Sequence, residues 1–92
     1  MSKIKDANTD FLFECIMKLE TLDECYAFFE DLCTVPEMKA MAQRAAVAKL
    51  LYDKTVYNDI VEKTGASTAT ISRVNRSLAY GAGGYDIVFN RK

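Results

Sequence analysis

The chain has 92 residues and a mass of 10.3 kDa, which is the size of one domain. Half of its residues are hydrophobic and 27% are charged, a globular composition that excludes a disordered chain. No apolar run approaches the ~18–20 residues that a membrane span requires, and no apolar signal region precedes the domain. We therefore expect a single cytoplasmic domain over residues 1–92, with no membrane partner.

The residue types disfavour catalysis. Histidine, the commonest general base, is absent, and no nucleophile elbow, carboxylate pair or phosphate-binding glycine loop occurs. The three cysteines form no CxxC pair, and each has apolar neighbours at helical spacing. This pattern favours buried thiols in a reducing compartment over a disulfide, a zinc site or a redox sensor. An enzyme is the weakest interpretation, and no metal or cofactor is expected.

Charge is distributed unevenly along the chain although the formal net charge is only −1. Residues 1–37 hold nine acids and three bases, whereas residues 38–80 hold three acids and seven bases. This asymmetry indicates an anionic partner for the second part alone. The alternative is that the charges only cover solvated helix faces.

The spacing of apolar residues predicts a first helix over residues 8–19. Its apolar positions extend around more than one face: Phe11, Leu12, Phe13, Cys15, Ile16, Met17 and Leu19. Because so short a chain buries only ~60–65% of its surface alone, such a helix is expected to pack against a second chain. Burial of Phe13 and Met17 therefore requires a dimer.

Two further helices are marked by T-x-x-E sequences, which are typical of capping boxes. The first begins at Thr21 and has an apolar face that extends to Cys33. The second begins at Thr34, has Pro36 in its first turn, and extends to Tyr52 through an alanine-rich segment. Residues 8–52 are thus predicted to be the dimerisation helices.

Residues 55–80 have the spacing of a helix-turn-helix. Thr55 is expected to cap a helix over residues 56–64, and Gly65 to end it in a left-handed conformation. Ser67 is expected to cap the second helix. The predicted inward residues are Ile60 and Val61, then Ile71, Val74 and Leu78, with Ala66 inside the turn. Residues 81–92 form a Gly-rich tail, whose glycines are interpreted as a helix terminator and hinge.

The outward face of the second helix suits a DNA major groove. It carries Thr68, Ala69, Ser72, Asn75 and Arg76, and no acid occurs from Thr64 to Ala79. Small and hydroxyl side chains can contact base edges, while cations contact phosphates. The expected phosphate contacts are Lys54, Lys63, Arg73 and Arg76. The alternative is a plain packing corner without a ligand.

The run TGASTATISR at residues 64–73 resembles the turn and recognition helix of the tryptophan repressor. GASTATISRVNRSLAYGAGGYD is similar to the Trp repressor-like YerC/YecD subgroup of that superfamily, as is PEMKAMAQRAAVAKLL before it. The resemblance covers residues 10 to 85. It implies an all-α fold of five to six helices, an intertwined homodimer, and a cytoplasmic DNA-binding transcriptional repressor.

The resemblance also implies which residues bind. The groove-facing positions are Tyr57, Asn58, Thr68, Ala69, Thr70 and Ser72, to which the charge pattern adds Arg76. Tyr57 and Asn58 differ from the repressor's residues, so its operator sequence does not transfer.

The corepressor positions fall on Arg44, Arg73, Thr34 and Ser77, but Val74 replaces a glycine that lies beside the ligand ring. We therefore expect that tryptophan does not bind as it does in the repressor, and the effector is left unidentified. The alternative role of Arg44 and Arg73 is phosphate contact or surface charge.

The sequence is compatible with two functions. The first is a dimeric helix-turn-helix regulator that binds double-stranded DNA. The second is a protein-interaction module that uses the acidic N-terminal helices, with the helix-turn-helix as a scaffold.

Overall fold

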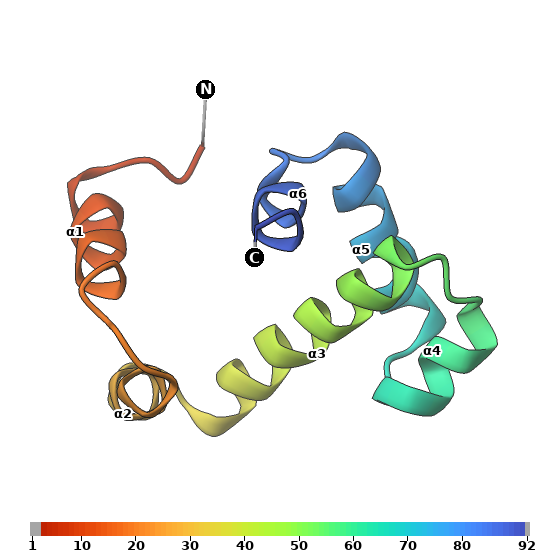
Figure 1. The fold of residues 1–92 in the computed structure, drawn as a ribbon, viewed down its shortest axis with the longest axis horizontal. Coiled ribbons are helices and arrows are strands. Elements are labelled where there is room, and N and C mark those ends of the chain that lie inside the picture. Colours follow the sequence, from red (N-terminus) through yellow and green to blue (C-terminus); the bar gives the residue numbers. More distant parts are fainter. Residues whose placement is uncertain (1–2, 92) are drawn as a thin grey trace. The chain divides into compact units, whose positions relative to one another are not determined.

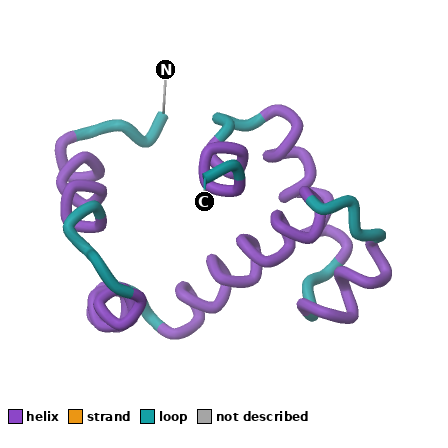
Figure 2. Tube along the Cα trace, in the orientation of Figure 1, coloured by secondary structure: helices purple, strands orange, loops and turns teal. Residues whose placement is uncertain are grey.

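The computed structural model describes residues 3–91. Over that range helices are joined by loops and turns and no strand occurs, which confirms the predicted all-α class (Figure 2). The helices are α1 (Ala7–Ile16), α2 (Leu22–Leu32), α3 (Val35–Tyr52), α4 (Tyr57–Thr64), α5 (Thr68–Tyr80) and α6 (Gly84–Phe89), labelled in Figure 1. They form two compact units, Met1–Met38 and Lys39–Lys92.

Helix α1 is shorter than predicted. It begins where the Asp6 carboxylate accepts the Thr9 amide hydrogen at 2.7 Å. It ends at Ile16, whereas the apolar pattern predicted an end at Leu19. The amides of Lys18 and Leu19 donate to carbonyls three residues earlier, so the α-helix ends in a turn there.

Both predicted T-x-x-E starts are confirmed. The Thr21 hydroxyl accepts the Glu24 amide hydrogen at 3.1 Å at the start of α2. At the start of α3 the capping is reciprocal: the Thr34 hydroxyl accepts from the Glu37 amide, and the Glu37 carboxylate accepts from the Thr34 amide at 2.8 Å. The bonds from Thr34 hold the pKa of Glu37 below its ordinary value.

The first unit has no buried side chain among its described residues, 3–38. Large apolar side chains are instead exposed, including Phe11 at 65%, Phe13 at 47%, Met17 at 83% and Leu22 at 74%. Burial of such side chains is the main favourable contribution to folding. Within this chain, α1 and α2 therefore leave the apolar surface that would form a core open to solvent.

The second unit has the core. Val47 and Ala48 of α3, Ile60 of α4, Ala66 of the turn, and Ile71 and Val74 of α5 are each at most 2% exposed. The predicted inward positions of Ile60, Ala66, Ile71 and Val74 are confirmed, and Leu78 is half-buried. The prediction for Val61 was wrong: it is 36% exposed, because the short α4 presents Ile60 alone to the core.

The end of α3 has an unusual turn. Lys54 has a φ of 68°, in the left-handed region that usually favours glycine. Its amide donates to the Leu51 carbonyl and the Thr55 amide donates to the Leu50 carbonyl, which is the hydrogen-bond pattern of a Schellman motif. The prediction that Thr55 caps the next helix was wrong: Val56 occupies that position, without a side-chain hydrogen bond.

The Gly-rich tail contains a sixth helix. Gly81 ends α5 as predicted, but Gly83 has a φ of 83° and begins α6, so the interpretation of these glycines as only a terminator and hinge was wrong. Tyr85 and Phe89 pack against the core. The Tyr52 ring lies 5.3 Å from the Phe89 ring, and the Tyr52 hydroxyl donates to the Asn90 side chain at 2.6 Å. Aromatic contacts with α3 thus hold α6 in place.

Candidate nucleic-acid interface

A rigid turn joins α4 to α5. Gly65 has a φ of 72° and its amide donates to the Val61 carbonyl at 2.8 Å, as the sequence predicted. The Thr64 hydroxyl donates to the Ile60 carbonyl at 2.7 Å and accepts the Ala66 amide hydrogen at 3.1 Å. These local bonds satisfy the backbone polar groups of the turn.

A contact from α3 also restrains this turn. The Gln43 amide nitrogen donates to the Thr64 carbonyl at 3.2 Å, in a half-buried position. Gln43 could not be predicted from the sequence as part of this site, because its partner is 21 residues away and no local pattern marks the pair. The bond anchors the helix-turn-helix to the longest helix of the chain.

Helix α5 begins at Ser67, as predicted. The Ser67 side chain accepts the Thr70 amide hydrogen at 3.1 Å, and the Ser67 and Thr70 hydroxyls lie 3.1 Å apart in a hydrogen bond. Thr70 is half-buried. Its hydroxyl is therefore partly occupied within the protein, unlike the hydroxyls of Thr68 and Ser72.

The outer face of α5 is exposed and has no carboxylate. Ile71 and Val74 turn into the core, while the remaining face is open to solvent: Thr68, Ala69, Ser72, Arg73, Asn75, Arg76 and Ser77. No Asp or Glu occurs from Thr64 to Tyr80. Within residues 3–91, Arg73 and Arg76 form no ion pair, so both guanidinium groups are free to contact an anion.

The first turn of α4 supplies two more of the predicted contact residues. Tyr57 is 38% exposed and Asn58 is exposed. Lys63, in the last turn of α4, and Lys54, before its start, are exposed as well. The structure thus leaves the predicted contact residues at both ends of α4 accessible to solvent.

The predicted effector residues are divided between the two units. Arg44 on α3 is exposed, as are Arg73 and Ser77 on α5, whereas Thr34 belongs to the first unit and its hydroxyl caps α3. Val74, the residue in place of glycine, is 2% exposed and packs in the core.

Among the described residues, no helix is long and apolar enough to cross a membrane.

Comparison with known proteins assigns the chain to a family. The model of the Trp repressor protein family matches residues 7–92. The protein YerC of Bacillus subtilis (strain 168) is 46% identical over 91 residues, which cover 99% of this chain and 88% of YerC. The crystal structure of a TrpR-like protein from Eubacterium eligens has a TM-score of 0.92 at 57% identity, covering 97% of this chain and 92% of that chain. A structure from Staphylococcus aureus has a TM-score of 0.92 at 47% identity, covering 97% and 89%. The chain belongs to the Trp repressor family.

Proposed function

We propose that this protein is a cytoplasmic, sequence-specific DNA-binding transcriptional regulator that acts as a homodimer and represses its targets. The observation that carries the proposal is the exposed, carboxylate-free face of α5, held on the core by Ile71 and Val74. A DNA duplex repels carboxylates and attracts cations, so such a face suits it. The proposal is one of binding and not of catalysis.

The proposed contacts divide by chemistry. Thr68, Ala69 and Ser72 lie on the first half of α5, and their small side chains are suited to base edges and to the thymine methyl group. Arg73 and Arg76 are suited to phosphates, which position the protein without carrying sequence information. Tyr57 and Asn58 extend the interface to the start of α4. Thr70 contributes less through its hydroxyl, because that group is hydrogen-bonded to Ser67.

Fluorescence anisotropy with genomic fragments tests the proposal. We expect binding at 50 mM salt that weakens linearly in a log–log plot as salt rises, because each neutralised phosphate releases a counterion. Absence of binding at low salt would contradict the proposal. It would favour the alternative in which the nine exposed acids of residues 1–37 contact a basic protein.

The exposed apolar surface of the first unit supports the proposed homodimer. Its described residues have no buried core of their own, and Phe11, Met17 and Leu22 are more than half exposed. A second copy of the chain has the same exposed apolar surface, and most oligomers of proteins are symmetric assemblies of identical chains. Burying these side chains against that copy would give α1 and α2 the core that they lack.

A glutamate on this surface is expected to split the dimer. Met17→Glu places a charge where an apolar contact is proposed, and burial of an unpaired charge is strongly unfavourable. Sedimentation equilibrium should show a dimer for the wild type and a shift to monomer for Met17→Glu. Lys18→Glu, at the next position, is the control and should stay dimeric. A wild-type protein that sediments as a monomer would overturn this part of the proposal.

Tryptophan is not the proposed effector. Val74 stands where the repressor has glycine, and we expect its branched side chain to fill space that the indole ring would need. Calorimetric titration should therefore detect no micromolar tryptophan binding, and a micromolar affinity would refute this expectation.

A further inference from the structure

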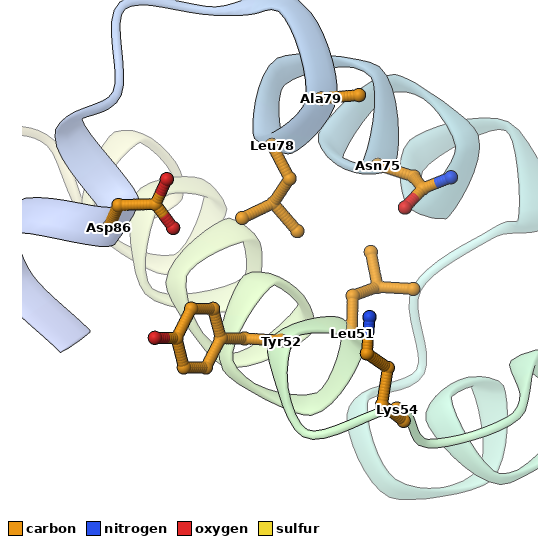
Figure 3. Close-up of a pocket in the computed structure, with 7 residues that line it drawn as sticks. All are labelled: Leu51, Tyr52, Lys54, Asn75, Leu78, Ala79 and Asp86. Carbon is orange, nitrogen blue, oxygen red and sulfur yellow. The ribbon is translucent and has the colours of Figure 1, made fainter. Parts of the chain in front are cut away.

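A groove of about 570 Å³ lies between the end of α3, the second half of α5 and the start of α6 (Figure 3). This volume falls within the ~300–1,000 Å³ range of small-molecule sites. None of the predicted effector residues lines the groove. It is lined by apolar side chains and the Tyr52 ring together with three polar side chains: Leu51, Tyr52, Leu78 and Ala79, then Lys54, Asn75 and Asp86.

The three polar side chains of the groove are exposed and have no partner among the described residues. Within residues 3–91, the side chains of Lys54, Asn75 and Asp86 form no hydrogen bond and no ion pair. Figure 3 shows the Lys54 ammonium beside Leu51 and the Asp86 carboxylate directed toward Leu78, on opposite sides of the two leucines. The groove therefore presents a cation, an anion and an amide around an apolar centre.

The backbone around the two charged residues of the groove is ordered by hydrogen bonds and packing. The backbone of Lys54 is held in the left-handed turn by the hydrogen bonds of the Schellman motif, so the side chain starts from a defined position at the end of α3. Asp86 lies in the first turn of α6, and contacts of Tyr85 and Phe89 with the core hold that helix. Asp86 is thus carried by a packed helix, and Lys54 by a hydrogen-bonded turn at the end of α3.

We propose that this groove binds a small zwitterion with an apolar middle, of the class of apolar dipeptides. The ligand carboxylate would pair with Lys54, its amine with Asp86, and its peptide group with the Asn75 amide. Its aliphatic side chains would cover Leu51 and Leu78.

Isothermal calorimetry with leucyl-leucine tests the site on the full chain without DNA, so its result is independent of the proposed function. We expect saturable binding to the wild type. N-acetyl-leucyl-leucine lacks the amine and leucyl-leucine amide lacks the carboxylate. Each should bind about tenfold more weakly, the size of one lost charge-assisted hydrogen bond. Absence of binding at millimolar dipeptide, or equal binding of all three, would overturn the proposal.

Substitutions in the groove test which residues bind leucyl-leucine. Asp86→Asn and Lys54→Met should each weaken leucyl-leucine binding about tenfold, while Lys63→Met, which removes an exposed lysine outside the groove, should not change it. Circular dichroism should show the wild-type helical content for each variant. Lys54→Gly serves as a second variant, because glycine suits the left-handed turn and preserves the fold. Wild-type affinity in the groove variants would overturn the proposal.

A second copy is the competing occupant. If the groove is an interface between copies of this chain, Asp86→Asn and Lys54→Met should shift the oligomeric state in sedimentation equilibrium. That result would also overturn the proposal, whereas an unchanged oligomeric state together with lost dipeptide binding supports it.

Discussion

Replacing Ser72 by glutamate is expected to reduce DNA affinity by roughly 100-fold. Ser72 is exposed on the carboxylate-free face of α5, so the new charge would lie against the phosphates and base edges of a bound duplex. Juxtaposed like charges cost several kcal/mol, and about 3 kcal/mol corresponds to that change in affinity. Anisotropy titration of the same DNA fragment with both proteins measures the effect.

A matched variant separates charge from size. Ser72→Gln introduces a side chain of the length of glutamate without its charge, so it should retain far more of the DNA affinity. Both variants should keep the wild-type melting temperature and oligomeric state, because Ser72 lies outside the core. Unchanged DNA binding by Ser72→Glu would remove α5 from the interface.

Replacing Ile60 by alanine is expected to destabilise the second unit by about 3 kcal/mol, within the range of 2–5 kcal/mol for buried isoleucines. Ile60 is fully buried in the core that joins α3, α4 and α5. Removing its side chain loses apolar burial and leaves a cavity. Urea unfolding followed by circular dichroism measures the change in the free energy of unfolding.

The neighbouring residue provides the control. Val61 is one position along α4 and 36% exposed, so Val61→Ala should cost less than about 1 kcal/mol. Equal destabilisation by the two variants would contradict the arrangement of α4 on the core. If only Ile60→Ala lowers the free energy of unfolding, any loss of DNA binding by that variant follows from the loss of the core that supports α5.

The features of the fold that depend on local chemistry could be predicted from the sequence. Ser67, Thr34 and Gly65 mark helix ends through bonds within four residues, and the structure has each of them at the expected place. The outward position of Val61 could not be decided locally, because a helix of eight residues has room for only part of its apolar pattern on the core. Helix α6 depends on the contact of Phe89 with Tyr52, 37 residues earlier in the chain, which no local pattern indicates.

In the candidate site, too, some features follow from local sequence and others depend on tertiary packing. The exposure of Thr68 and Ser72 follows from the helical period once Ile71 and Val74 are placed in the core. The groove between α3, α5 and α6 could not be predicted, because Lys54, Asn75 and Asp86 are far apart in sequence. The tertiary packing of α6 brings them to one groove.

Selection of bound fragments from random double-stranded DNA tests most directly whether a pair of α5 helices recognises DNA. We predict an enriched, two-fold symmetric sequence whose half-sites are ~34 Å apart, the spacing of successive major grooves. Ser72→Glu should enrich no sequence under the same conditions. Enrichment of the same sequence by Ser72→Glu, or no enrichment by the wild type, would contradict DNA recognition through α5.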